Sequence, residues 1–324
     1  KETFGDELAE ATNDPFYMVN FLRPDVYDED GGLESEAPKV YEPGGNLEEL
    51  RPVVLEFLTR YNTEFPSKRM DLVLFNDALE HLLRINRLME MPRGSGLLVG
   101  VGGSGKQSLV RISSFISRCI QFQITLTKTY NKNSFLENMK ELYTFAGHQC
   151  KPTTFLFTES EIKDEVFLEF INSILLTGEI PGLFAKDEIM AITADLRNTF
   201  LKERPGHEDT QDNLKQFFID KVRDNLHLMI CMSPMSAKFA VRARKFPGVV
   251  SCPTIDWFLP WPSDALVALS RATIQDFPVE CTPEVKEGLM THMGMVHTLV
   301  TQVCDEYFVS MRRKVFQTPK SYLS

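Results

Sequence analysis

Short apolar runs alternate with longer segments of helical period from about residue 97 onward. The runs have the length and uninterrupted apolar character of buried strands, and they cover residues 97–99, 122–126, 153–159 and 226–232. The intervening segments place apolar residues three and four positions apart, over residues 109–120, 135–146, 167–176, 195–203 and 212–225. Strands that alternate with helices predict an α/β fold with a parallel sheet and helices on both of its faces.

The flanking regions have a different pattern. Residues 47–58 and 77–89 are predicted to be helices that precede the first strand, and residues 264–276 and 283–314 form a smaller, all-helical piece after the last. The last helix carries a one-sided apolar stripe, which is typical of a core-facing surface. Its members are Met290, Met293, Val296, Leu299, Val300 and Val303.

The region before residue 47 is the least globular part of the sequence. Nine acidic residues and one lysine lie between Pro24 and Leu50, with glycine pairs as helix breakers. This composition predicts an irregular, solvated acidic connector over residues 1–46. An acidic docking site is the alternative interpretation of the same charges.

Composition excludes several classes of function. The net charge of −10 argues against a main role on nucleic acid or an anionic membrane. No apolar run approaches the ~20 residues that a bilayer crossing needs, and no signal peptide opens the sequence. The six cysteines are widely spread without a C-x-x-C pair, which favours reduced thiols in a cytosolic compartment. Six scattered histidines predict no metal centre.

The strongest chemical signal follows the run at residues 97–99. The pattern G-x-x-x-x-G-K predicts a strand, a loop whose backbone N–H groups surround a phosphate, and a helix whose N-terminus adds further donors. Its candidate binding residues are Gly100, Val101, Gly102, Gly103, Ser104, Gly105, Lys106, Gln107 and Ser108.

Two other interpretations fit the same glycines. The spacing also satisfies the dinucleotide motif G-x-G-x-x-G, which needs an acidic residue about 20 positions further on. No Asp or Glu occurs between Lys106 and Leu136, so this interpretation is disfavoured. A glycine-rich turn that binds nothing is the remaining alternative.

The groups that would hold magnesium are altered. P-loop NTPases use a Ser or Thr directly after the lysine and an Asp at the end of a neighbouring strand. This sequence has Gln107 and Thr158 there, and Ser108 is turned ~100° away along the helix. Glu159 lies where a water-activating carboxylate is expected, and Ser233 lies where an Asn would orient the attacking water in related ATPases. The sequence therefore predicts phosphate binding with slow or absent turnover.

An apolar segment at residues 70–75 precedes the phosphate loop. In P-loop proteins such a segment often lies against the purine, which makes Leu72 and Val73 candidate site positions. Packing in the core explains the same pattern equally well.

Taken together, these motifs resemble the fourth AAA+ module of an axonemal dynein heavy chain. The resemblance rests on residues 92–109 and on four later segments, and it is looser before residue 70, where Phe4-Gly5-Asp6 carries most of it. The later segments are Phe155-Leu156-Phe157-Thr158-Glu159, Gly178-Glu179-Ile180-Pro181-Gly182-Leu183-Phe184, Cys231-Met232-Ser233-Pro234 and Ile255-Asp256-Trp257-Phe258. Residues 318–323 resemble the point where the coiled-coil stalk of that family begins.

The resemblance implies a module in a six-membered ATPase ring, with neighbouring modules of the same chain, other dynein chains and, through the stalk, a microtubule as partners. It implies a large α/β subdomain over residues 47–262, a small helical subdomain over 263–317 and the start of the stalk at 318–324. The implied ligand is ATP or ADP, with Mg²⁺ poorly supported by the altered ligands, and the implied location is the axoneme of a cilium or flagellum.

In that family Glu159 is the Walker B glutamate, and a module lends an arginine to its neighbour from a position that falls here near Cys252. Arg242 and Arg244 lie nearby and are interpreted first as surface charges. Two other functions stay open: a stand-alone catalytic P-loop NTPase or kinase, and a nucleotide-free structural module.

Overall fold

The computed structural model describes residues 17–28, 33–274, 277–313, 315, 318, 319 and 322. The chain divides into two compact units, residues 1–83 and 84–324, and the boundary between them falls within helix α3 (Asn76–Glu90). Residues 4–6 and most of 318–324, which contribute to the family resemblance, lie outside the described residues.

The first unit contains two short antiparallel strand pairs and one long helix. β1 (Met18–Val19) pairs with β4 (Glu42–Pro43), and β2 (Val26–Tyr27) pairs with β3 (Leu33–Ser35). They are followed by α2 (Leu47–Glu64) and the short helix η1 (Pro66–Lys68).

The segment at residues 70–75 has no regular structure but is fixed to α2. The Asn62 side chain donates to the Met70 carbonyl at 3.0 Å and accepts from its N–H at 2.8 Å. Arg51 Nε donates to the Leu74 carbonyl at 2.9 Å.

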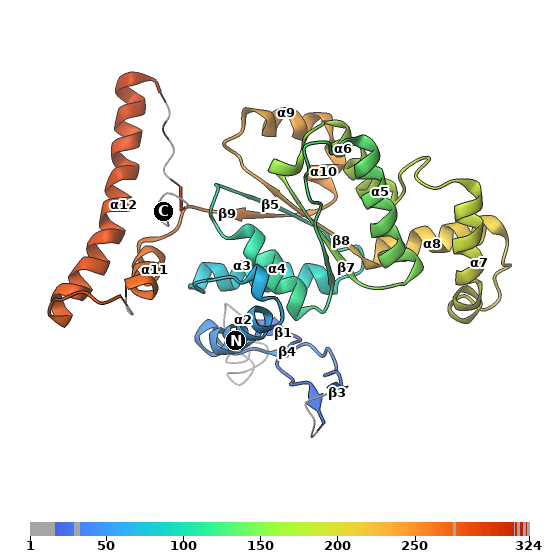
Figure 1. The fold of residues 1–324 in the computed structure, drawn as a ribbon, viewed down its shortest axis with the longest axis horizontal. Helices are drawn as coiled ribbons and strands as arrows, with labels where there is room; N and C mark the ends of the chain where they lie inside the picture. The colour runs from blue at the N-terminus through green and yellow to red at the C-terminus, as the bar shows by residue number, and fades with distance from the viewer. Residues whose placement is uncertain are drawn as a thin grey trace, which may run out of the picture. The chain divides into compact units, whose positions relative to one another are not determined.

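The second unit is built on a parallel sheet with the strand order β6-β7-β8-β5-β9 (Figure 1). Its strands are β5 (Gly96–Gly100), β6 (Ile120–Phe122), β7 (Thr153–Thr158), β8 (Leu226–Met232) and β9 (Thr254–Phe258). This architecture confirms the α/β prediction. Two details differ: β6 begins and ends earlier than predicted, and β9 was not predicted because Asp256 interrupts its apolar pattern.

Alternate side chains of the central strands enter opposite faces of the sheet. On one face, Leu97, Phe155 and Ile230 join a core that includes side chains of α5, α6 and α8. Their neighbours Leu98 and Met229 are equally buried on the other face. Both faces are therefore covered, as the uninterrupted apolar runs predict.

The helices of this unit follow the predicted order. They are α4 (Lys106–Ile116), α5 (Lys132–Tyr143), the π-helical turn η2 (Thr144–His148), the 3₁₀ turn η3 (Glu159–Glu161), α6 (Val166–Thr177), α7 (Lys186–Glu203), α8 (Gln211–Asn225), α9 (Ala237–Lys245) and α10 (Pro247–Ser251). The helices α9 and α10 were not predicted. The sequence of α9 is strongly basic, and α10 is only five residues long, so neither gives a clear apolar period.

Two helices end the unit, α11 (Ser263–Ile274) and α12 (Pro283–Met311), and they pack together where Gly294 faces Val267. The prediction that the apolar stripe of the last helix faces the core is mostly wrong. Met290 is buried, whereas Val296, Leu299, Val300 and Val303 are between 38% and 59% exposed. A single partner helix covers only part of a 29-residue helix. No described helix is both long enough and apolar enough to cross a bilayer.

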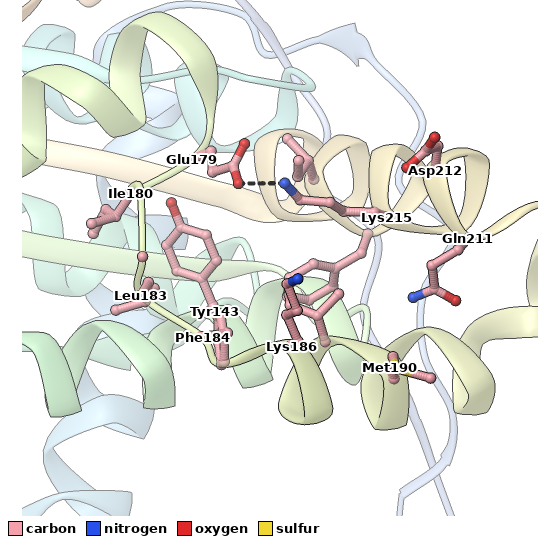
Figure 2. Close-up of a pocket in the computed structure, with 14 residues that line it drawn as sticks. Tyr143, Glu179, Ile180, Leu183, Phe184, Lys186, Met190, Gln211, Asp212 and Lys215 are labelled. Carbon is pink, nitrogen blue, oxygen red and sulfur yellow. Dashed lines mark ion pairs between the residues drawn. The ribbon is translucent and has the colours of Figure 1, made fainter.

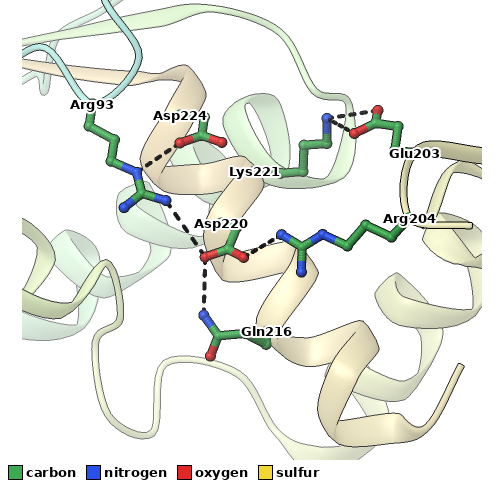
Figure 3. Close-up of polar contacts among 7 residues, drawn as sticks. All are labelled: Arg93, Glu203, Arg204, Gln216, Asp220, Lys221 and Asp224. Atoms are coloured by element: carbon green, nitrogen blue, oxygen red, sulfur yellow. Dashed lines mark hydrogen bonds and ion pairs between the residues drawn. The ribbon is translucent and has the colours of Figure 1, made fainter. Parts of the chain in front are cut away.

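A charge network fixes α8 to the segment that leads into β5 (Figure 3). Asp220 accepts from Arg204 Nη2 at 2.7 Å and from Gln216 Nε2 at 3.1 Å. Arg93 pairs with Asp220 at 3.9 Å and donates to Asp224 at 2.9 Å. Burial alone would raise the pKa of Asp220, but the hydrogen bonds and the two arginines together hold this pKa below its usual value.

We expect Asp220→Asn to lower the free energy of unfolding by about 1–2 kcal/mol at pH 7, because the amide loses the charge that three groups contact. Since the folded-state pKa is lowered, the contribution of Asp220 is present above the unfolded-state pKa of about 3.9 and is lost at lower pH. Urea unfolding of both proteins should show this difference narrowing as the pH falls below about 4. The exposed Asp212 of the same helix gives the control, and an equal effect of Asp212→Asn would contradict this account.

Candidate functional site

The predicted geometry of strand, loop and helix is confirmed. β5 ends at Gly100, and α4 begins at Lys106. Gly103 and Gly105 have φ angles of 82° and 86°, a region that side chains other than glycine rarely adopt. The glycines thus turn the chain sharply enough to place the loop at the carboxyl edge of the sheet, where β5 lies between β8 and β9.

Lys106 points back into this loop. Its Nζ donates to the carbonyls of Gly100 and Val101, both at 2.7 Å, and to Ser104 Oγ at 2.9 Å. Burial lowers the pKa of Lys106, and the nearby charge of Glu159 partly opposes this shift. The loop therefore holds a buried cation that lies against three neutral oxygens and the ring of Phe258, whose centroid is 5.9 Å away, and an anion would compensate its charge better.

The loop also has room for a ligand on one side. A Cβ atom added to Gly102 or Gly105 would meet no other atom within 4 Å. A Cβ added to Gly100, in contrast, would lie 2.5 Å from Phe258 Cβ on β9. Gly100 is thus required for strand packing, while Gly102 and Gly105 border open space, as a loop that binds phosphate through its backbone N–H groups requires.

The neighbouring strands bring the other predicted residues to the same edge. Thr158 ends β7 opposite Cys231 of β8, and Glu159 and Ser233 directly follow the two strands. The Thr158 hydroxyl lies 2.8 Å from Ser160 Oγ and is itself a neutral group. A threonine hydroxyl is a weaker ligand for a divalent cation than the carboxylate usual at this place.

Both carboxylate oxygens of Glu159 are occupied. Oε2 accepts from the Ser233 N–H at 3.2 Å, and Oε1 accepts from Arg242 Nη1 at 3.2 Å. Arg242 is only 6% exposed, so its interpretation as a surface charge is wrong. Arg244, two positions further on, is exposed, and within the described part of the chain it donates only to the carbonyl of Ala240 in its own helix.

Glu161 is a site residue that the sequence interpretation missed. Its Oε2 accepts from the Thr158 N–H at 2.6 Å, and its Oε1 accepts from Gln123 Nε2 at 2.9 Å. Burial raises the pKa of Glu161, although these hydrogen bonds work against the shift. The pattern Thr-x-x-Glu is the sequence signal of such a cap, and it was available in residues 158–161.

Four predicted candidates remain, two on α4 and two in the first unit. Gln107 is exposed and Ser108 is half-buried in the first turn of α4. Leu72 and Val73 are half-buried in the first unit, and their role beside a purine stays a prediction.

A separate hollow of about 410 Å³ lies beside α7 and α8 (Figure 2). Its apolar lining includes Tyr143, Leu183 and Phe184, and an ion pair of 2.8 Å joins Lys215 to Glu179 at its border. The Tyr143 hydroxyl already donates to the Gly178 carbonyl at 2.9 Å. Because these polar groups compensate one another, the hollow gives no indication of a charged ligand.

The parallel sheet and the glycine-lysine loop define an α/β protein of the P-loop class. The sequence matches the family described as "P-loop containing dynein motor region D4" over residues 70–324. The chain belongs to this family, which confirms the resemblance to dynein heavy chains.

Known relatives support the same assignment over the whole chain. Dynein axonemal heavy chain 5 of Mus musculus is 46% identical over 330 residues, dynein axonemal heavy chain 8 of Homo sapiens 42% over 327, and the dynein gamma chain of the flagellar outer arm of Chlamydomonas reinhardtii 45% over 326. Each comparison covers 100% of this chain and 7% of the relative. The chain therefore spans only a small part of the relatives it matches.

The contrast between two glycines of the loop can be tested directly. We expect Gly100→Ala to lower the free energy of unfolding by about 1–3 kcal/mol, because its Cβ would force β5 and β9 apart. Gly102→Ala adds the same atom to open space and should change stability by less than about 0.5 kcal/mol. Chemical denaturation of both variants measures the difference, and equal destabilisation would show that the space beside Gly102 is closed.

Proposed function

We propose that this chain is a regulatory ATP- or ADP-binding module, the fourth AAA+ module in the motor ring of an axonemal dynein heavy chain. Gly100 to Lys106 would surround the phosphates, with Gln107 and Ser108 beside them. The observation that carries the proposal is the buried Lys106 ammonium in a loop that stays open beside Gly102 and Gly105. A cation held in this way prefers an anionic ligand to backbone carbonyls.

We infer that hydrolysis at this module is slow or absent. The side chains at the two metal-binding places, Gln107 and Thr158, are neutral. Glu159, the carboxylate that would accept a proton from water, already accepts a protein hydrogen bond on each of its oxygens. Phosphate transfer depends on charges placed before the reaction begins, and the loss of one such contact commonly reduces the rate by ~10²–10³.

The role in the motor rests on the family. The matched relatives are named as axonemal and flagellar dyneins, and from them we infer a location in a cilium or flagellum. In such a chain the neighbouring modules would be the direct partners, and a stalk would connect the module to the microtubule. The module would then transmit the state of its nucleotide to the stalk. The division into residues 1–46, 47–262, 263–317 and 318–324 belongs to the same proposal.

A nucleotide-free structural module is the second candidate. One observation favours it: Lys106 already makes three hydrogen bonds within its own loop. The loop is thus stable without an anion, and the binding experiment below distinguishes the two functions.

We expect Lys106→Ala to weaken nucleotide binding about 10- to 100-fold, because a buried charged hydrogen bond contributes about 1.5–3 kcal/mol. The full chain in which this sequence occurs would be titrated with photoreactive 8-azido-ATP labelled at the α-phosphate. Labelled peptides from this module then report its occupancy alone. Lys186→Ala is the matched control, since Lys186 also begins a helix but lies outside the loop. Unchanged labelling in Lys106→Ala, or no labelling of the native module, would favour the structural candidate.

The coupling to the stalk makes a further prediction. If the nucleotide state of the module is transmitted, Lys106→Ala should change microtubule affinity by about fivefold or more, a shift of about 1 kcal/mol or more, which is the lower end of the range typical of coupling between sites. Co-sedimentation with microtubules at fixed nucleotide concentration measures this change. Equal affinities of the native chain, Lys106→Ala and Lys186→Ala would refute the coupling while leaving nucleotide binding intact.

A further inference from the structure

Arg242 is a buried charge at the edge of the sheet, 6% exposed, and the proposed binding role does not use it. It lies on α9, and its side chain is 7% exposed. Its Nε and Nη2 donate to the same oxygen of Glu165, at 3.0 and 2.9 Å. The remaining nitrogen, Nη1, donates to Glu159 Oε1 at 3.2 Å. Glu165 thus fixes the plane of the Arg242 guanidinium, and Glu159 accepts a hydrogen bond from the nitrogen that Glu165 does not contact.

These contacts fix the position of the Glu159 carboxylate. Its second oxygen accepts from the Ser233 N–H, so two fixed donors hold the carboxylate from two different elements. A carboxylate that takes a proton from water loses its charge at that moment, and the ion pair with Arg242 is lost with it. Proton transfer to Glu159 therefore requires that its ion pair with Arg242 be given up.

We propose that Arg242 is a positioning residue that locks Glu159 in an inactive ion pair, so that this lock, in addition to the altered metal ligands, limits hydrolysis at the module. The inference rests on the proposed nucleotide binding. In the blocked step, a water oxygen would bond to the γ-phosphorus, the bond to the β,γ-bridging oxygen would break, and Glu159 would accept the proton of the water. ADP and phosphate would be the products.

The structure also indicates that the lock can be removed without loss of the fold. Glu159 and Glu165 have side chains that are 29% and 40% exposed, so water can solvate both after the arginine is replaced. Arg244 on the same helix provides a matched control, because it contacts neither carboxylate.

The test compares two labels in the full chain in which this sequence occurs. 8-Azido-ATP labelled at the α-phosphate reports occupancy of the module, and the same nucleotide labelled at the γ-phosphate reports whether ATP remains intact. We expect the γ label to be lost about tenfold faster from Arg242→Met than from the native chain at equal α label. This increase is smaller than the effect of a fully competent general base. The double variant Arg242→Met/Glu159→Gln should retain the γ label as long as the native chain does. Arg244→Met should lose the γ label at the native rate.

A second measurement needs no nucleotide. Hydrogen exchange at the Ser233 amide should become at least threefold faster in Arg242→Met, because Glu159 is no longer held against it, and should stay unchanged in Arg244→Met. Arg242→Lys, which keeps the charge but not the fork, should give intermediate values for both readouts. This variant keeps the test decisive if Arg242→Met does not fold.

The outcomes separate the two proposals. No α label on the native module refutes nucleotide binding and, with it, the lock. Normal α label with an equal γ lifetime in the native chain and in Arg242→Met and Arg242→Lys refutes the lock alone. Rapid γ loss that persists in Arg242→Met/Glu159→Gln would also overturn it, because the arginine would then not act through Glu159.

Discussion

The second unit depends on the parallel pairing of β5 between β8 and β9. Gly96 to Val99 pair with both neighbours, and at Gly100 the β9 chain approaches so closely that only a hydrogen atom fits in place of a side chain. This contact fixes where the strand stops and the loop begins. Because the strands of this sheet are parallel, the carboxyl ends of β7 and β8 lie at the same edge. The strand directions alone therefore bring Thr158, Glu159 and Ser233 to this edge.

The sequence predicts the parts of this edge whose signals are local. The run 97–99 followed by glycines and a lysine defines strand, loop and helix within 15 residues, and β7 and β8 are read from unbroken apolar runs. The edge strand β9 is not predicted, because its pattern of burial is irregular and includes the buried acid Asp256. The Asp256 carboxylate accepts a hydrogen bond from Arg84 at 3.4 Å. Its place is set by β5, some 150 residues earlier in the chain.

The pairing of Arg242 with Glu159 could not be predicted for the same reason. α9 is rich in arginine and lysine, and neither its composition nor its period distinguishes the buried Arg242 from the exposed Arg244. The distinction arises only when the chain places Glu159 and Glu165 next to one face of the helix, 83 and 77 residues away. Long-range charge pairs of this kind determine chemistry but leave no periodic signal.

Binding and chemistry depend on different groups at this edge, and the difference explains how a module can retain one without the other. In the proposed binding role the loop would use backbone N–H groups and Lys106, which are fixed by glycine conformation and by the packing of β5. Turnover would need charged groups from β7 and the segment after β8, where the chain has neutral side chains and one carboxylate held by Arg242. Substitutions among the groups needed for turnover leave the phosphate loop unstrained, because those groups follow other strands than β5. A site built in this way can hold a nucleotide as a structural signal, with its lifetime set by release rather than by cleavage.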